Sequence, residues 1–215
     1  MSLRIGILGG MFDPVHNGHL GIAGVAIDVL SLDQVRLIPA RQPNHRDMPL
    51  CPQEQRLEML HLAVAGDPRM IVDDRELRRP GPSYTVDTLI SLQEEFPEAS
   101  LVFIMGIDSF NSLLGWERWQ QLFRLCHMLV IDRPGHRLKP HGLADRLDSR
   151  TDSATSLFAQ PVGNVWMLAG HDRDVSSSEV RERIKNRQAL DHLVPENVLR
   201  YMTEHDLYRS QPDRN

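Results

Sequence analysis

Residues 9–19 have the sequence GGMFDPVHNGH, and they connect an apolar run at 3–8 to an apolar-periodic segment that extends to Leu30. This order predicts a strand, a glycine turn and the start of a helix. A helix N-terminus collects unpaired N–H groups and the positive end of the helix dipole. His16 and His19 bring two imidazoles to this point. The segment is therefore suited to receive phosphate groups, and the chain is predicted to bind a nucleotide.

The spacing distinguishes this segment from the two commonest phosphate loops. It lacks the Lys-Ser/Thr pair of a P-loop, and no GxGxxG follows the strand. Zinc binding by His16 and His19 is disfavoured, because a helical metal pair is usually spaced by four and joined by a further ligand. Glycine turns and surface histidines would explain either feature alone, but not their combination directly after a strand.

The rest of the chain alternates between two hydrophobic patterns. Apolar runs predict strands at 3–8, 35–38, 70–72, 101–105, 128–131 and 165–168. Segments of helical period predict helices at 18–30, 53–65, 85–95, 109–125, 178–187 and 195–205. The alternation predicts an α/β fold, a Rossmann-like doubly wound parallel sheet with helices on both faces and a small C-terminal helical segment.

Composition narrows the functional classes. The chain has 215 residues, of which 41% are hydrophobic, as expected for one packed domain. A net charge of −5 argues against a nucleic-acid-binding surface. No apolar run approaches the ~20 residues of a membrane span or forms a secretory segment, so a cytoplasmic protein without membrane contact is predicted. Cys51 and Cys126 lack CxxC spacing and are predicted to be reduced, structural thiols.

Polar motifs follow several of the predicted strands. Gly9-Gly10 follows the first strand, 44–46 the second, 106–108 the fourth and Arg133 the fifth. The carboxyl ends of parallel strands meet at one edge of a sheet, where ligands bind in such folds. These motifs are therefore expected to converge on one site.

The pattern GxFDPxHxGH at 10–19 resembles the signature of the HxGH nucleotidyltransferase superfamily. From Leu3 to about Arg209 the chain is similar in particular to the bacterial nicotinate mononucleotide adenylyltransferases. The other segments that carry this resemblance are 44–46, 82–85, 106–109, Trp116, 133–135 and 176–181. The resemblance implies transfer of the adenylyl group of ATP to nicotinate mononucleotide, which gives nicotinate adenine dinucleotide (deamido-NAD) and pyrophosphate in NAD biosynthesis.

The resemblance also implies roles for individual residues. The catalytic residues would be His16, His19 and Arg181. The ATP site would contain Gly9, Gly10, Met11, Phe12, His16, His19, Gly106, Asp108, Ser176, Ser177 and Arg181. The acceptor site would contain His45, Arg46, Tyr84, Thr85, Trp116 and Arg133.

The expected organisation is a single domain, 1–215. A Rossmann-like core spans 1–175, and a helical part, 176–209, completes the ATP site. Mg²⁺ is implied by ATP, held mainly through the phosphates because this ion keeps several waters. No protein ligand is assigned to it. Asp13 lies in the phosphate loop, but Asp-Pro is also a turn former.

Several of these residues have a competing structural interpretation. Ser176 with Glu179 three residues later is a capping box, and Asp108 is an N-cap candidate for a helix at 109–114. Trp116 and Trp119 are three apart in a helical pattern, so either could belong to the core. His45 and Arg46 lie in a Pro-rich loop, where basic residues are normally solvated surface charges, and Arg133 could instead form a surface ion pair.

The implied chemistry requires little of the enzyme's own reactive groups. A phosphate nucleophile is already ionised at neutral pH, so positioning and charge stabilisation carry the reaction. Adenylyl transfer to nicotinamide mononucleotide or to phosphopantetheine is the nearest alternative. A non-catalytic nucleotide sensor and an NAD-dependent oxidoreductase are alternatives from other classes, the latter weakened by the missing GxGxxG.

Overall fold

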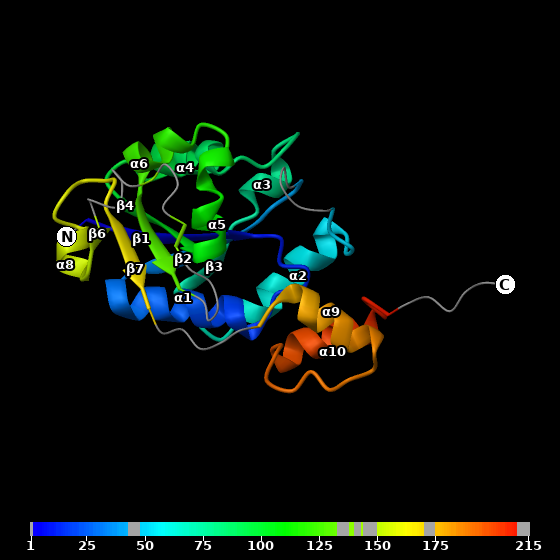
Figure 1. Cartoon of the computed structure of the whole chain (residues 1–215). Coiled ribbons are helices and arrows are strands. Elements are labelled where there is room, and N and C mark those ends of the chain that lie inside the picture. The colour runs from blue at the N-terminus through cyan, green and yellow to red at the C-terminus, as the bar shows by residue number, and fades with distance from the viewer. Residues whose placement is uncertain are drawn as a thin grey trace.

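The computed structural model describes residues 2–42, 48–132, 138–139, 143, 150–169 and 175–209. Its sheet is parallel throughout, in the order β3-β2-β1-β4-β5-β7-β6 (Figure 1). The strands are β1 (Arg4–Gly10), β2 (Gln34–Pro39), β3 (Met70–Val72), β4 (Ser100–Gly106), β5 (His127–Ile131), β6 (Arg150–Thr151) and β7 (Val165–Leu168). The sheet extends outward from β1 in both directions, so the predicted doubly wound topology is confirmed.

The helices of the described residues alternate with these strands. They are α1 (Asn17–Leu30), α2 (Gln53–Val64), α3 (Arg75–Arg78), α4 (Thr85–Glu95), α5 (Ile107–Asn111), the 3₁₀ turn η1 (Leu113–Gly115), α6 (Trp119–Leu125), α8 (Ala154–Leu157), α9 (Ser177–Lys185) and α10 (Glu196–Glu204). The predicted strands and most predicted helices are confirmed to within two residues. The edge strand β6 was not predicted, because its two residues form no apolar run.

Two apolar clusters cover the two faces of the sheet. One includes Ala26 of α1 and Met59 of α2, and the other includes Leu89 of α4. Figure 1 shows α4 and α6 on one side of the sheet and α1 on the other. The central strand β4 serves both clusters, because its neighbours Phe103 and Ile104 point to opposite faces.

The single helix predicted at 109–125 was wrong. The chain forms α5, η1 and α6 instead, with extended backbone at Trp116 and a left-handed residue at Arg118 (φ 48°). Leu113 and Leu122 are both completely buried in the same apolar cluster. Nine residues apart in a straight helix, they would lie on opposite sides, about 180° around the axis. Tertiary packing therefore breaks the helix so that both leucines reach the core.

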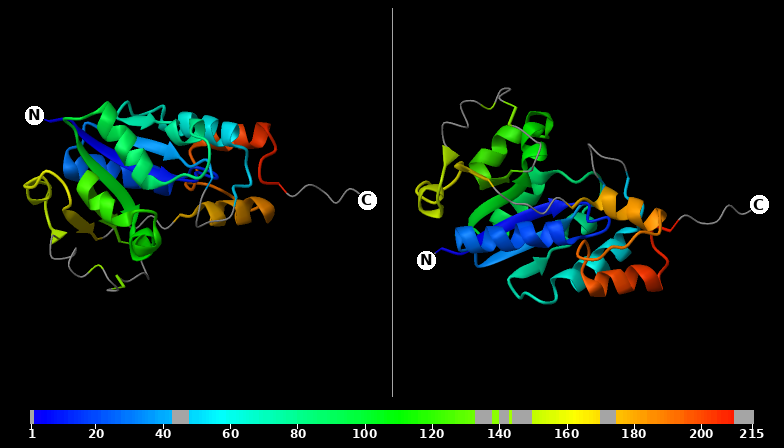
Figure 2. Two further views of the ribbon diagram at one scale, coloured as in Figure 1. Left: turned by 90° about the horizontal axis from the view of Figure 1, so that it is seen from above. Right: turned by 60° about the horizontal axis from the view of Figure 1, so that its bottom comes forward.

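The C-terminal helices α9 and α10 lie together at one end of the molecule (Figures 1 and 2). The amide of Asn197 donates to the carbonyl of Leu62 on α2 (2.5 Å). The backbone N–H of Asn17 at the start of α1 donates to the carbonyl of Leu193 (2.8 Å). This part of the chain is thereby joined to the end of the sheet where the motifs converge.

Cys51 and Cys126 are buried and form no disulfide with each other or with another described residue. Within the described part of the chain, none of the helices combines the length and the apolar content that crossing a membrane requires.

Candidate nucleotide-binding site

The loop between β1 and α1 begins where β1 ends, between β2 and β4. The carbonyl of Gly10 accepts a hydrogen bond from the N–H of Ala40, the residue after β2 (2.9 Å). A Cβ on Gly10 would stand only 3.2 Å from the ring of Phe12. Phe12 is buried and has φ 48°, a conformation that costs free energy in an aromatic residue. The loop is therefore a tightly packed turn whose shape is imposed by its surroundings.

Arg56, which was not predicted as a site residue, holds this loop from α2. Its side chain is completely buried, Nη1 donates to the carbonyl of Met11 (2.5 Å), and Nη2 donates to the carbonyl of Ala40 (2.9 Å). Burial lowers the pKa of Arg56, and the charge of Asp13 opposes this shift. One guanidinium thus ties the turn after β1 to the turn after β2.

His16 and His19 lie at the N-terminus of α1, as predicted. His16 is the buried N-cap residue, and the two rings stack with their centroids 3.7 Å apart. The backbone N–H of His16 donates to Nδ1 of His19 (3.3 Å). A ring nitrogen that accepts carries no proton, so Nε2 is the nitrogen of the His19 ring that is left to donate. Nε2 of His19 is therefore a donor of the kind that a phosphate oxygen requires.

Gly18 permits this arrangement of the histidines. A Cβ at this position would stand 2.9 Å from Nδ1 of His16 and 3.1 Å from the carbonyl oxygen of Val175. The second obstacle is backbone, which cannot move as easily as the end of a side chain. The glycine between the two histidines is thus required by the close approach of the segment before α9.

The N-terminus of α9 packs against the same loop. Ser176 caps the helix, its Oγ accepting from the N–H of Glu179 (3.1 Å), as the capping interpretation predicted. Ser177 Oγ donates to the carbonyl of Pro14 (2.9 Å). One serine therefore serves as the cap while its neighbour anchors the helix to the loop.

Arg181 extends from the second turn of α9 to the loop. Its Nη1 donates to the carbonyl of Asp13 (2.6 Å) and its Nη2 to Oγ of Ser178 (3.2 Å). The structure thus brings Arg181 to the loop that carries His16 and His19, although more than 160 residues separate them in sequence. Basic and hydrogen-bonding groups from both ends of the chain meet here.

Asp13 is the second residue that sequence reasoning underestimated. Its buried carboxylate accepts from the backbone N–H groups of Leu50 (2.8 Å) and Cys51 (3.2 Å) and from the hydroxyl of Tyr208 (2.8 Å). The Asp-Pro dipeptide indicated only a turn. Its partners come from two distant segments, and no local pattern points to them.

A cavity of about 300 Å³ adjoins the glycines of the loop. Its wall includes Gly9, Gly10, Met11, Ala40, Glu76, Ser83, Tyr84, Thr85, Phe103, Ser109, Ser112, Trp116 and Glu117. Three predicted acceptor residues, Tyr84, Thr85 and Trp116, thus share a cavity with three predicted ATP-site residues. Thr85 is the first residue of α4, so N–H groups of that helix N-terminus lie at this wall.

The two tryptophans in question have different surroundings. Trp116 lies in the cavity wall, where its Nε1 donates to Oγ of Ser112 (3.3 Å). Its ring and that of Phe103 pack in a T-shaped arrangement, with their centroids 6.1 Å apart. Trp119 packs edge-on against Phe123 of α6 (6.2 Å). Both tryptophans are partly buried against the same apolar cluster, and Trp116 lines the cavity whereas Trp119 does not.

Glu76, also not predicted, is a buried acidic residue in the cavity wall. Its carboxylate accepts from Oγ1 of Thr88 (2.6 Å). Burial raises the pKa of Glu76, and the hydrogen bond from Thr88 opposes this shift. A glutamate in the four-residue helix α3 gives no sequence signal of burial, so only the structure reveals it.

His45, Arg46 and Arg133 lie outside the described residues. Asp108 is exposed in the first turn of α5, whose N-cap is Gly106, so the alternative of Asp108 as N-cap is wrong. The capping position moves because α5 begins two residues earlier than predicted.

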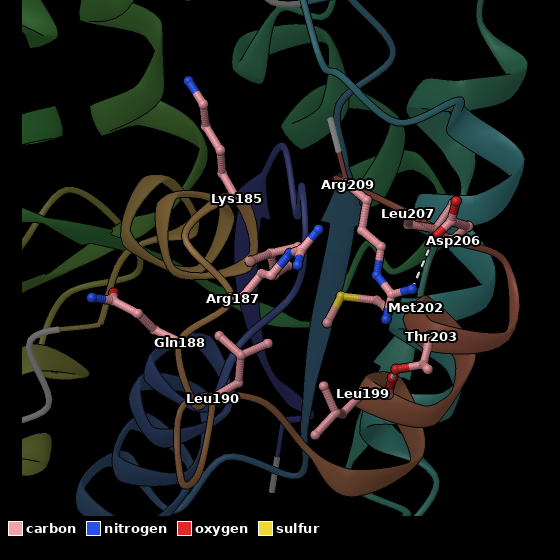
Figure 3. A pocket seen from close by; sticks show the side chains of 11 residues that line it. Lys185, Arg187, Gln188, Leu190, Leu199, Met202, Thr203, Asp206, Leu207 and Arg209 are labelled. Atoms are coloured by element: carbon pink, nitrogen blue, oxygen red, sulfur yellow. Dashed lines mark hydrogen bonds and ion pairs between the residues drawn. The ribbon is translucent and has the colours of Figure 1, made fainter. Parts of the chain in front are cut away.

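A second cavity, of about 700 Å³, lies between α9 and α10 (Figure 3). Leu190, Leu199 and Met202 contribute to its wall, and Arg209 pairs with Asp206 at its rim (3.1 Å). The predicted site residues that the structure describes do not line it. It shares Lys185, Asp206, Leu207 and Arg209 with a third cavity, of about 690 Å³, which Arg181 also lines.

Known proteins resemble this chain over nearly its whole length. Residues 7–183 match a family model described as cytidylyltransferase-like. A protein of Aeromonas salmonicida named "Probable nicotinate-nucleotide adenylyltransferase" is 42% identical over 212 residues, which cover 98% of this chain and 99% of that protein. A protein of Pseudomonas putida with the same name is 40% identical over 209 residues, 96% of this chain and 95% of its own.

Solved structures share the fold at low sequence identity. Plasmodium falciparum nicotinic acid mononucleotide adenylyltransferase in complex with NaAD is similar with a TM-score of 0.74 at 16% identity, over 96% of this chain and 97% of that one. The same enzyme in complex with APC gives a TM-score of 0.71, also at 16% identity and with the same coverage of both chains. These likenesses support the Rossmann-like description of the sheet.

Proposed function

This chain belongs to the cytidylyltransferase-like family and to the nicotinate-nucleotide adenylyltransferases, and we propose that it transfers the adenylyl group of ATP to nicotinate mononucleotide. Its identity to the Aeromonas salmonicida protein of that name is 42% over nearly the full length of both chains. The 5′-phosphate oxygen of the mononucleotide attacks the α-phosphorus of ATP. The bond from that phosphorus to the bridging oxygen breaks, and pyrophosphate leaves. The other product is nicotinate adenine dinucleotide, an intermediate of NAD biosynthesis.

The observation that carries this proposal is the meeting of His16, His19 and Arg181 at one loop. Nε2–H of His19 donates to the α-phosphate, where negative charge accumulates in the transition state, and His16 lies beside it in the stack. Arg181 supplies a permanent positive charge for the β- and γ-phosphates. The N-termini of α1 and α9 add their dipoles to the same place. The remaining groups that we assign to ATP are Gly9, Gly10, Met11, Phe12, Gly106, Asp108, Ser176 and Ser177.

The cavity beside Gly9, Gly10 and Met11 is suited to the acceptor. Its volume of about 300 Å³ suits a pyridine ring with part of its ribose. The ring would stack on Trp116, and its carboxylate would accept hydrogen bonds at the N-terminus of α4, beside Tyr84 and Thr85. We assign His45, Arg46 and Arg133 to the acceptor as well, on the strength of the sequence pattern alone.

Magnesium enters this proposal as part of the substrate MgATP. Mg²⁺ keeps several waters and is commonly held by substrate phosphates with one or two carboxylates. In the described residues, no three or more His, Cys, Asp or Glu side chains are grouped so that they could hold a metal ion. In our proposal the ion is therefore bound mainly by the phosphates of ATP.

We also propose that 176–209 completes the ATP site of a single domain, 1–215. The hydrogen bonds from Ser177 to Pro14 and from Arg181 to Asp13 support this organisation. They connect the C-terminal helical part to the phosphate loop itself, so the sheet alone would lack both the arginine and the second helix N-terminus.

Pyrophosphate release by the purified protein tests the function directly. With MgATP and either nicotinate or nicotinamide mononucleotide, we expect kcat/KM to favour nicotinate by at least about tenfold, because its carboxylate gains a charge-assisted hydrogen bond at α4. A preference for nicotinamide would retain the chemistry and refute the acceptor. Release with neither compound, despite measurable ATP binding, would refute the acceptor assignment and favour another acceptor or a nucleotide sensor.

A further inference from the structure

The Asp13 carboxylate connects three segments at the candidate site. It lies in the loop that leads to His16, and it accepts from both N–H groups of Leu50 and Cys51, immediately before α2. Its Oδ1 also accepts from the hydroxyl of Tyr208 (2.8 Å), and its Oδ2 lies 3.9 Å from Nη1 of Arg181. Of these partners, Tyr208 is the most distant from Asp13 in sequence.

Tyr208 reaches Asp13 through a distorted turn that follows α10. Asp206 and Tyr208 have φ values of 53° and 61°, and the N–H of Leu207 between them donates to the carbonyl of Met202 (2.9 Å). Left-handed backbone is uncommon in a bulky aromatic residue, because it is sterically strained and costs free energy. Figure 3 shows the side chains of Asp206, Leu207 and Arg209 in this turn. This strained conformation brings the phenol of Tyr208 to the phosphate loop.

We propose that Tyr208 is a positioning residue for adenylyl transfer, because its hydroxyl fixes the Asp13 carboxylate and thereby the loop that carries His16 and His19. This inference rests on the proposed function. Tyr208 touches neither substrate in it. It acts through Asp13, whose carboxylate accepts from the Tyr208 hydroxyl and whose backbone carbonyl accepts from Arg181. The hydroxyl thereby influences the position of the two histidines and also that of Arg181.

The protonation of the pair agrees with this role. Burial and the Asp13 carboxylate both raise the pKa of Tyr208, so the phenol keeps its proton and donates throughout the physiological pH range. Leu50 and Cys51 donate to Asp13 through backbone N–H groups, which no substitution of their side chains removes. The hydroxyl of Tyr208 can therefore be deleted as a single oxygen atom while both backbone donors to Asp13 stay in place.

Tyr208→Phe removes that oxygen and keeps the ring. We expect kcat to fall by about tenfold, the loss typical of one hydrogen bond to a charged acceptor, while KM for MgATP and for the mononucleotide stays within about twofold. Tyr201→Phe is the matched control, since it removes the same group from α10, where the ring packs against His205. Equal kcat values for Tyr208→Phe and the wild type would overturn the proposal, as would equal losses in both variants.

A double-mutant cycle with Asp13→Asn tests whether Tyr208 acts through Asp13. Tyr208→Phe should then cost less than about twofold in the Asp13→Asn background, and a full tenfold cost there would overturn the inference. Hydrogen exchange of peptides covering 10–16 and 48–52 provides a readout that needs no activity. Faster exchange in Tyr208→Phe than in Tyr201→Phe supports the fixing of the loop by Tyr208 even if the wild type transfers no adenylyl group, and unchanged exchange overturns it.

Discussion

Replacing His19 by alanine is expected to lower kcat at least a hundredfold while leaving the fold intact. The loss of one preorganised donor to a developing negative charge typically costs ~3 kcal/mol of transition-state stabilisation. In this protein the donor is Nε2–H, because Nδ1 of His19 accepts from the backbone of His16. KM for MgATP should change much less than kcat, since the contact strengthens in the transition state. Steady-state kinetics with nicotinate mononucleotide measures both parameters.

His61→Ala is the matched control for this experiment. His61 is exposed in the last turn of α2, and we expect its removal to change kcat by less than about twofold. His19→Asn would retain a side-chain N–H and should recover part of the loss. Normal turnover in His19→Ala would refute the catalytic assignment. An equal loss in His61→Ala would point to damage unrelated to the site.

Replacing Arg56 by methionine is expected to lower the free energy of unfolding more than any of the other substitutions proposed. Its side chain is completely buried and its guanidinium satisfies two backbone carbonyls, those of Met11 and Ala40. Methionine retains the volume but leaves both acceptors without these donors, at about 1–3 kcal/mol each. The cost of burying the guanidinium is relieved at the same time, so we expect a net loss of about 3 kcal/mol in the free energy of unfolding. Urea denaturation followed by circular dichroism measures this difference.

Arg78→Met provides the comparison, because Arg78 is exposed on α3 and pairs with Asp74 at the surface. Such pairs contribute little, so its free energy of unfolding should stay within about 0.5 kcal/mol of the wild type. A similar value for Arg56→Met would show that the two carbonyl contacts are not needed to hold the loop. Activity should fall in Arg56→Met even below its unfolding midpoint, because the turn at Met11 loses its support.

The sequence predicted those features that local patterns determine. The strands other than β6 follow from apolar runs, and the position of His16 and His19 at a helix N-terminus follows from a glycine turn and a helix start that are visible within eleven residues. The break near Trp116 was missed, since a helical period continues across it while the burial of both Leu113 and Leu122 requires a bend. The hydrophobic periodicity of a segment does not show where packing against the rest of the protein bends it.

The support of the loop could not be predicted for a related reason. Arg56 reaches Met11 across 45 residues and Tyr208 reaches Asp13 across 195. Neither contact leaves a motif, because an arginine on a helix and a tyrosine in a late turn are common surface residues. The assignments of His45, Arg46 and Arg133 remain predictions from pattern alone.

The hydrogen bonds between the phosphate loop and the C-terminal helical part also bear on the order of folding. They span 163, 168 and 195 residues, whereas β1, β2 and β3 pair within the first third of the chain. Closing long loops is entropically costly, so such contacts tend to form late. Recovery of tryptophan fluorescence on refolding should therefore precede recovery of turnover. During synthesis, the glycine turn would emerge long before α9 and α10 and yet be the last part to gain its final shape, so that a partly made chain would have a sheet before it had a working enzyme.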